Sequence, residues 1–494
     1  MQNILGGISD VFTLSNLLVI AGGILLGQVV GAAPGLNAIM AIAIAVPLTF
    51  YMSPLAAIAF LLAVNKGGAF GGSVTAILVN TPGSPEAAAT CLDGHPLAQK
   101  GQAEKALKVS LYSSIFGDTF SDLVLALVAA PLSVVALKMG PPEITTVILL
   151  SLTLIAAVAG RSLLIGLLAA CFGFMMSLIG TDPIEGTSRL SFGIIELEDG
   201  IPLVSSAIGL LAVSEIFLQF EKKIAGHSHA VSRVASPKPA DRQVSKREFK
   251  GILPAILRGS VIGTGIGILP GVGAVIASFI SYGSAKRASK HQELFGKGSL
   301  EGIAAAESAN NAVIGANLIP LFTLGIPGNV VAAILIGAFM IHGVIPGPTM
   351  FQDHGRLIAG IFTAMLLANL VNFLIARASL RVYAKTAFLP RSIVFPVILI
   401  LCITGAYISE NGMFGVIVMY ACGLVGYFMA KFNISYVPFI IGYILGPIFE
   451  TNLRQTLIIS GGSLEIFFTR PLALAIIILT LISIVRFVWQ RNKI

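Results

Sequence analysis

The chain has 494 residues, of which 56% are hydrophobic and 11% are charged, and its formal net charge is +8. Soluble domains contain about 25% charged residues, so this composition excludes a soluble protein and indicates a polytopic membrane protein. The basic residues gather in short loops, as the positive-inside bias of membrane proteins predicts, and this speaks against nucleic-acid binding. An anionic substrate is compatible with the charge but does not follow from it.

The N-terminus lacks a basic stretch followed by a small-residue cleavage site, so no removable signal peptide is expected. The isolated cysteines have no metal-ligand spacing and are predicted to serve as small packing residues. They are Cys91, Cys171, Cys402 and Cys422.

Apolar runs predict helices through most of the first half. They cover residues 14–30, 38–50, 54–64, 111–136, 144–159, 163–179 and 201–220. A lysine-containing polar loop at 93–108 is placed on the cytoplasmic side, and a mildly acidic loop follows at 181–200. Residues 221–250 carry eight basic and three acidic side chains. This composition predicts a flexible cytoplasmic linker.

The second half repeats this organisation and ends in a basic, cytoplasmic C-terminus. Its apolar runs cover residues 252–282, 357–375, 393–409, 413–429, 436–449 and 471–489. The predicted organisation is therefore a first membrane repeat at 1–220, the linker at 221–250 and a second membrane repeat at 251–494. The fold class is an all-α polytopic membrane protein with about 10–12 membrane segments.

Two glycine- and proline-containing motifs recur in order in the two halves. The Pro34-Gly35 break returns as Pro270-Gly271 at an offset of 236, together with Gly27, Gly31 and Ala38 at Gly263, Gly267 and Ala274. The stretches 65–85 and 310–329 share a Pro-Gly turn and a leading Asn at an offset of 245. Such pairs indicate re-entrant or broken helices that meet around a transporter binding site. Different loop charges after the two turns predict that the repeats are inverted.

The Pro-Gly breaks are the candidate substrate site. A helix that starts after such a break directs free N–H groups and its positive dipole end at an anion, whereas released carbonyls suit a cation. Four breaks in symmetric order favour a site over simple packing kinks. The candidate substrate-binding residues are Pro34, Gly35, Asn37, Lys66, Asn80, Thr81, Pro82, Gly83, Ser84, Pro270, Gly271, Gly273, Pro327, Gly328 and Asn329.

The candidate cation-binding residues are Asn65, Ser73, Asn80, Glu307, Asn310 and Asn311. Glu307, Asn310 and Asn311 form a compact polar cluster that could offer oxygens to a cation or cap the following helix. Lys66 could pair with a substrate carboxylate or snorkel to the membrane interface, and both alternatives stay open.

Asp118 and Asp122 are four residues apart and share one helix face. An ion relay would suit this spacing, but the preceding Gly117 favours a helix end at the interface. A membrane-embedded enzyme using these acids and Glu307 is the rival class. The sequence shows no Walker motif, nucleophile–base pair or metal-ligand pattern, so no catalytic residue, metal or other cofactor is predicted.

Long motifs across the chain resemble the large membrane subunit of the bacterial tripartite tricarboxylate transporters. They are GGSVTAILVNTPG (71–83), LDGHPLAQKGQAEKAL (92–107), GPPE (140–143), GILPGVGAVIASFISY (267–282), FGKGSLEGIAAAESANNA (295–312), LGIPG (324–328) and NLRQTLIISGG (452–462). The family's acidic residue after the first Pro-Gly turn is replaced by Ser84, and the aromatics usual near Asn65 and Lys66 differ. The ligand therefore need not be citrate.

The resemblance implies a multi-pass protein of the bacterial inner membrane that imports small carboxylates by symport with Na⁺ or H⁺. It implies a small membrane subunit, a periplasmic substrate-binding protein and surrounding lipid as partners, and it leaves a homodimer open. The repeat architecture suggests an elevator-like movement of the hairpin domain. A receptor-independent carrier or an exporter is the alternative within transport.

Overall fold

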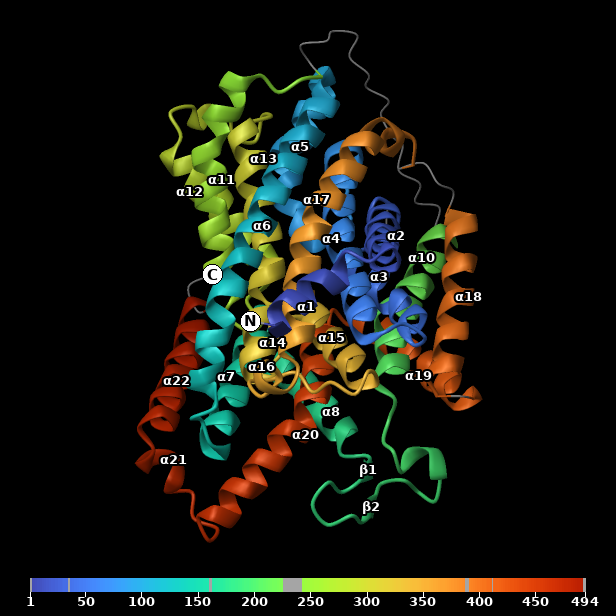
Figure 1. The fold of residues 1–494 in the computed structure, drawn as a ribbon, viewed down its shortest axis with the longest axis vertical. Helices are drawn as coiled ribbons and strands as arrows, with labels where there is room; N and C mark the ends of the chain where they lie inside the picture. Colours follow the sequence, from blue (N-terminus) through green and yellow to red (C-terminus); the bar gives the residue numbers. More distant parts are fainter. Residues whose placement is uncertain are drawn as a thin grey trace.

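A computed structural model describes residues 2–33, 36–159, 162–224, 242–386, 391–410 and 412–491, and these are almost entirely helical (Figure 1). Six helical stretches in the described chain are long and apolar enough to cross a membrane. They are Leu14–Gly31, Pro54–Val79, Pro85–Ala136, Leu203–Glu221, Gly355–Leu380 and Met413–Lys431, and shorter apolar helices lie between them. The all-α polytopic class is confirmed.

The first half begins with α1 (Gln2–Val11), α2 (Leu14–Gly31), α3 (Ala38–Ala45), η1 (Val46–Thr49) and α4 (Pro54–Val79). It continues through η2 (Pro85–Ala87), α5 (Ala88–Leu97), η3 (Ala98–Gln102), α6 (Ala103–Ala136), α7 (Pro141–Ala159) and α8 (Leu163–Ser177). It ends with β1 (Gly180–Thr181), β2 (Ser188–Arg189), η4 (Ile195–Leu197), α9 (Leu203–Ile208), η5 (Gly209–Val213) and α10 (Ser214–Ile224).

The second half begins with α11 (Lys246–Gly267), α12 (Gly273–Ala288), η7 (Gln292–Leu294), α13 (Leu300–Ala316), α14 (Leu318–Leu324) and α15 (Val330–Ile341). The remaining helices are α16 (Met350–Asp353), α17 (Gly355–Thr386), α18 (Arg391–Ser409), α19 (Met413–Lys431), α20 (Tyr436–Ile459), α21 (Ile466–Thr469) and α22 (Pro471–Arg491). The expected break between 252 and 282 is confirmed by the gap between α11 and α12. Most of the predicted linker lies outside the described residues.

Helix α4 corrects one expectation from the sequence. The run 54–64 and the following glycine-rich stretch are one continuous helix, which ends where Asn80 adopts a left-handed conformation with φ of 54°. The glycines serve close packing here, since a Cβ at Gly67 would lie 2.4 Å from the carbonyl oxygen of Ile24 in α2. Small residues allow two helix backbones to approach in this way without breaking either helix.

The two halves use equivalent glycines for equivalent contacts. A Cβ at Gly27 would lie 2.1 Å from the carbonyl oxygen of Val64, and one at Gly263 would lie 2.3 Å from that of Ala309. Gly27 and Gly263 are related by the offset 236, and Val64 and Ala309 by the offset 245. Packing of α2 on α4 therefore has its counterpart in packing of α11 on α13. The inverted relation of the repeats stays a prediction.

The polar segment expected as a loop at 93–108 is largely helical, and it anchors the start of α13. Asp93 in α5 is buried, and its Oδ1 accepts N–H groups of Gly296, Gly298 and Ser299, each at 2.8 Å. The Tyr282 hydroxyl donates to Asp93 Oδ2 at 2.8 Å. One buried carboxylate thus ties the first half to the approach of α13, and its donors explain why it tolerates burial.

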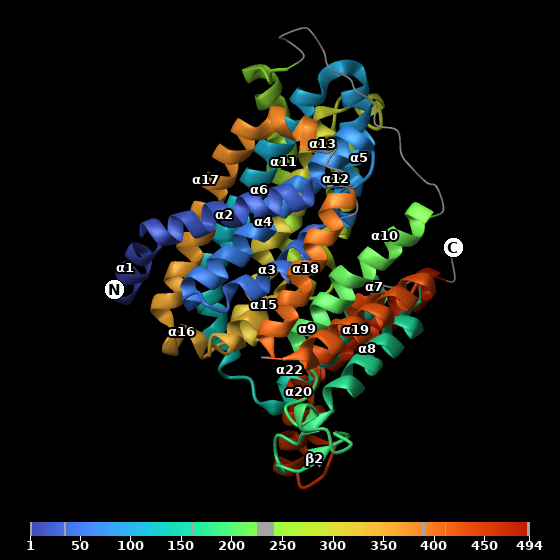
Figure 2. The ribbon, with the colours of Figure 1, turned by 90° about the vertical axis from the view of Figure 1, so that its right-hand side faces the viewer.

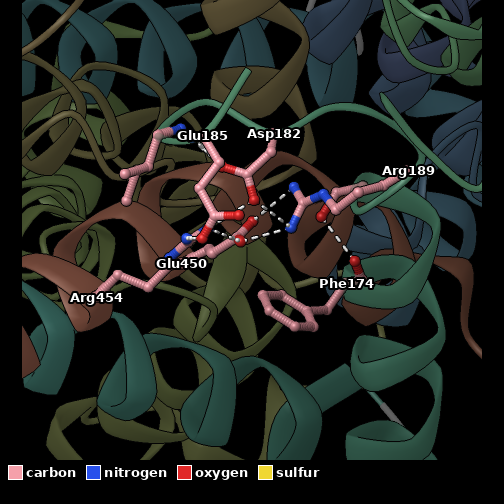
Figure 3. A network of polar contacts seen from close by, with 8 residues as sticks. Phe174, Asp182, Glu185, Arg189, Glu450 and Arg454 are labelled. Atoms are coloured by element: carbon pink, nitrogen blue, oxygen red, sulfur yellow. Dashed lines mark hydrogen bonds and ion pairs between the residues drawn. The ribbon is translucent and has the colours of Figure 1, made fainter. Parts of the chain in front are cut away.

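The β1–β2 segment lies at the opposite end of the molecule from α5 and α13 (Figures 1 and 2). Two arginines hold it to α20. Arg189 and Arg454 both contact Glu450, at 2.7 and 3.2 Å, and Arg454 also contacts Asp182 at 2.7 Å (Figure 3). Backbone N–H groups of Glu185 and Ile184, then Arg454, hold the Asp182 pKa well below its ordinary value.

Candidate functional site

The first Pro-Gly turn is fixed against the helix that precedes it. The N–H of Gly83 donates to the carbonyl oxygen of Gly72 at 3.2 Å. A Cβ at Gly83 would lie 2.7 Å from Gly72 Cα and 2.8 Å from the carbonyl oxygen of Gly31, the last residue of α2. The turn and the start of the α2–α3 break therefore touch, and only glycine leaves room for this contact.

The second half makes the same association. The N–H of Gly271 in the α11–α12 break donates to the carbonyl oxygen of Gly328 at 2.8 Å. A Cβ at Gly328 would lie 2.8 Å from the carbonyl oxygen of Asn317, which is equivalent to Gly72 at the offset of 245. Gly325 ends α14 in the left-handed conformation with φ of 71°, as Asn80 ends α4. In each half, the Pro-Gly turn thus contacts the helix break that precedes it in the sequence.

The segments after the turns cross between the halves. Helices η2 and α5 of the first half pack on α12 and α13 of the second half. In the second half, α15 packs reciprocally on α3 and α4 of the first. Sequence reasoning predicted that the two hairpin elements meet, and the structure brings the elements that carry them into contact.

The asparagines after the breaks act as helix caps. Asn37 Oδ1 accepts the N–H of Met40 at 2.9 Å, and Asn329 Oδ1 accepts the N–H of Ala332 at 2.8 Å. A side chain thus already occupies one of the backbone N–H donors that the sequence predicted to be free at each of these helix starts. The starts of α5 and α12 have no side-chain cap.

The other predicted substrate residues differ in exposure. Asn80 and Pro82 are exposed, Gly83, Ser84, Pro327 and Gly328 are buried, and Thr81, Pro270, Gly271 and Gly273 are half-buried. Pro34 and Gly35 lie outside the described residues. The first turn is therefore open at its tip and closed where it meets α4.

Two buried asparagines near these turns have side-chain atoms without a hydrogen-bond partner in the described part of the chain. They are Asn310, through Nδ2, and Asn317, through both of its side-chain polar atoms. Such groups are rare in proteins because each costs about 1–3 kcal/mol when buried without a partner, and each calls for an explanation such as a water, an ion or a ligand. Asn317 was missed from the sequence, although its place at the α13–α14 break, equivalent to Gly72, could have identified it.

Glu307 lies at the centre of a second polar group. Its carboxylate accepts hydroxyl hydrogens from Ser73 at 2.9 Å, from Ser114 at 2.9 Å and, at short range, from Thr90. These donors come from α4, α6 and α5. Three hydroxyl donors thus already occupy most of the acceptor capacity of this carboxylate.

The alternative that Glu307, Asn310 and Asn311 cap a helix is wrong. All three lie inside α13, whose N-terminus is capped by Ser299, and Asn311 Nδ2 donates to the Glu307 carbonyl oxygen at 3.0 Å. All three are buried. The predicted cation residue Asn65 is also buried, in α4.

Lys66 corrects two further expectations. Its side chain is fully buried, and its ammonium donates to Asp118 Oδ1 at 2.7 Å, to Asp122 Oδ2 at 2.8 Å and to Asn369 Oδ1 at 2.9 Å. It therefore does not snorkel. Asp118 and Asp122 are buried inside α6, so their assignment to a helix end at the interface is wrong. In this conformation the protein itself supplies the carboxylates that Lys66 pairs with.

The described residues contain no group of three or more His, Cys, Asp and Glu side chains that could hold a metal ion. The polar side chains described above instead lie at the two Pro-Gly turns, at the helix breaks that contact these turns, and in the buried cluster around Lys66. Broken helices at corresponding positions of two halves define the architecture of a secondary transporter.

The chain matches the family described as Tripartite tricarboxylate transporter TctA family over residues 17–441, and it belongs to this family. It is 36% identical over 485 residues to an uncharacterised 52.8 kDa protein in the TAR-I ttuC' 3' region of Agrobacterium vitis, covering 98% of this chain and 95% of the relative. It is 37% identical over 223 residues to an uncharacterised protein in the TAR-II ttuC' 3' region of the same organism, covering 45% of this chain and 92% of the relative. No solved structure matches the chain.

Proposed function

We propose that the chain is the membrane subunit that carries a small tri- or dicarboxylate inward in a receptor-dependent secondary transporter driven by a cation gradient. The family, a transporter family, supports this role. The observation that carries the proposal is the unpartnered buried side chain of Asn317 at the second turn, with the unpartnered amide of Asn310 nearby in α13.

These side chains suit a carboxylate ligand. Two asparagine amides supply neutral donors, and a carboxylate accepts several such hydrogen bonds. Neutral donors allow the anion to enter and leave without breaking a buried ion pair. The uncapped start of α12 would add backbone N–H groups and the positive end of its helix dipole.

Transport requires the site to open alternately to the two sides of the membrane. We assign the moving part to the turn-bearing elements, which would shift against the remaining helices in an elevator-like motion. The basic residues Lys246, Lys250 and Arg377 gather around one cavity of about 660 Å³, which we place at the cytoplasmic side of the inner membrane. The β1–β2 segment then faces the periplasm, where the substrate-binding protein would dock.

Reconstitution tests this function. Vesicles containing the chain and the small membrane subunit would be supplied with labelled succinate, malate and citrate, with and without the periplasmic binding protein and with Na⁺ or H⁺ gradients. We expect accumulation only when receptor and gradient are both present. Accumulation without receptor would instead identify a receptor-independent carrier, and the absence of any gradient-driven flux would refute the proposal.

The assigned residues have their own test. Asn310→Ala and Asn317→Ala should each lower uptake at least tenfold, because each loss of a hydrogen bond to a charged ligand corresponds to about 1.5–3 kcal/mol. Asn452→Ala is the matched control, because its amide bonds only within α20. Unchanged uptake in both site variants would show that the substrate binds elsewhere.

A further inference from the structure

The buried group of Lys66, Asp118 and Asp122 is outside the substrate site assigned above, and its charges do not balance. One ammonium faces two carboxylates, and the side-chain exposures are 0% for Lys66 and 2% and 1% for Asp118 and Asp122. With every group ionised, the cluster would hold one uncompensated negative charge away from water. Such a charge is strongly unfavourable in a protein interior.

One oxygen of the cluster also has no partner. Asp122 Oδ2 receives Lys66 Nζ and Asn369 Nδ2, each at 2.8 Å, whereas Asp122 Oδ1 has no hydrogen-bond partner among the described residues. This oxygen faces α13, because a Cβ at Gly315 would lie 2.6 Å from it. The cluster that holds the unbalanced charge thus also contains an oxygen without a partner, Asp122 Oδ1.

We propose that this cluster is the proton-binding site of the transporter and that Asp122 Oδ1 takes up the proton. A proton on this oxygen makes the cluster neutral while the Lys66–Asp118 ion pair stays intact. A sodium ion fits less well, because it needs several oxygen ligands and would lie close to the Lys66 ammonium. The inference rests on the proposed transport function and selects H⁺ as its coupling ion.

Among the described residues, the neighbouring helices bring no further charged side chain into an ion pair with the cluster. Helices α4, α6 and α17 meet here, and α17 contributes the uncharged Asn369. On α13 the nearest titratable group is Glu307, which is hydrogen-bonded to Ser114, one turn before Asp118 on α6. Arg258 on α11, which also packs on α6, is partly exposed and forms no ion pair with the cluster.

The cluster connects helices of the two halves, so binding of a proton can change how these helices contact each other. Lys66 and the aspartates belong to the first half, and Asn369 belongs to α17 of the second. Asn372, one turn further along α17, donates to the Lys66 carbonyl oxygen at 3.3 Å and accepts from Gln28 at 2.6 Å. A neutral cluster favours this closed contact of α17 with α4 and α6. Loss of the proton restores the uncompensated charge and favours an arrangement in which water reaches Asp122.

Infrared spectroscopy of the full chain in lipid nanodiscs tests the proton directly. The wild-type protein should show the carbonyl band of a protonated carboxyl group at neutral pH, and this band should disappear at strongly alkaline pH. Asp122→Asn should abolish the band, and Glu307→Gln, the matched control, should retain it. A band that survives in Asp122→Asn, or a spectrum without a protonated carboxyl, would overturn the assignment.

Transport provides the second readout. Asp122→Asn mimics the protonated state, so it should fold and exchange labelled substrate across the membrane without a gradient. Its uptake should lose the acceleration by an inward H⁺ gradient that the wild type shows. If acceleration by H⁺ persists in this variant, or if Na⁺ raises the melting temperature of the wild type but not of the variant, the cluster is not a proton site. If the wild-type protein takes up no substrate under any gradient, the transport function is refuted. The infrared experiment would then still decide whether Asp122 binds a proton.

Discussion

Replacement of a single packing glycine tests the helix contacts that build both halves. In Gly27→Ala the new Cβ would meet the Val64 carbonyl oxygen at 2.1 Å, well inside van der Waals contact. The oxygen belongs to the backbone of α4 and cannot rotate away, so α2 must shift. Overpacking of this kind costs about 1–3 kcal/mol.

Gly22→Ala, in the same helix, is the control. Its Cβ would meet nothing within 4 Å, so it should gain roughly 0.5–1 kcal/mol from the better helix propensity of alanine. The two variants should therefore differ by roughly 1.5–4 kcal/mol. Gly263→Ala and Gly265→Ala form the equivalent pair in α11, with a Cβ 2.3 Å from the Ala309 carbonyl oxygen and with nothing within 4 Å.

Thermal unfolding in detergent, followed by size-exclusion chromatography of the surviving protein, ranks these variants. Gly27→Ala and Gly263→Ala should melt well below their partners, and by similar amounts, if the two halves share one packing arrangement. Equal melting temperatures within each pair would refute the argument from close backbone contact. A large loss in one half only would contradict the equivalence of the halves.

Three further predictions concern single side chains. Lys66→Met should destabilise the protein by about 3–5 kcal/mol, because it leaves buried acids without their cation, and added Asp118→Asn should restore most of this loss in a melting assay. Asp182 has a lowered pKa in the folded state, so its contribution is complete above the unfolded pKa of about 4 and is lost as the pH falls below it. Asp182→Asn should therefore melt lower than wild type at neutral pH, with the difference shrinking on acidification; a constant difference would contradict this. Asn329→Ala should cost about 1 kcal/mol by removing the α15 cap, whereas Asn329→Asp should keep the stability, and equal melting of both would exclude a capping role.

The sequence was sufficient to predict the membrane class and the break between α11 and α12. Long apolar runs, a small number of charges and repeated Pro-Gly pairs are properties of the sequence itself. They can therefore be recognised without knowing how the helices pack. The offsets 236 and 245 relate residues that prove to make equivalent contacts, as Gly27 and Gly263 do. The resemblance of long motifs led to the same family that the comparison shows.

Tertiary structure decided the environment of each polar residue. The stretch 65–85 contains glycines and a lysine that predict an interrupted helix, but α4 is continuous because its glycines contact α2 and its lysine meets two aspartates from α6. Neither partner is adjacent in sequence, so composition could not reveal the ion pairs. The offset of 245 relates Asn317 to Gly72, but only the tertiary structure shows that Asn317 contacts the second turn and lacks a hydrogen-bond partner. Burial and pairing of a polar side chain depend on segments that lie far apart in the sequence. Which of these segments contact each other is known only from the tertiary structure.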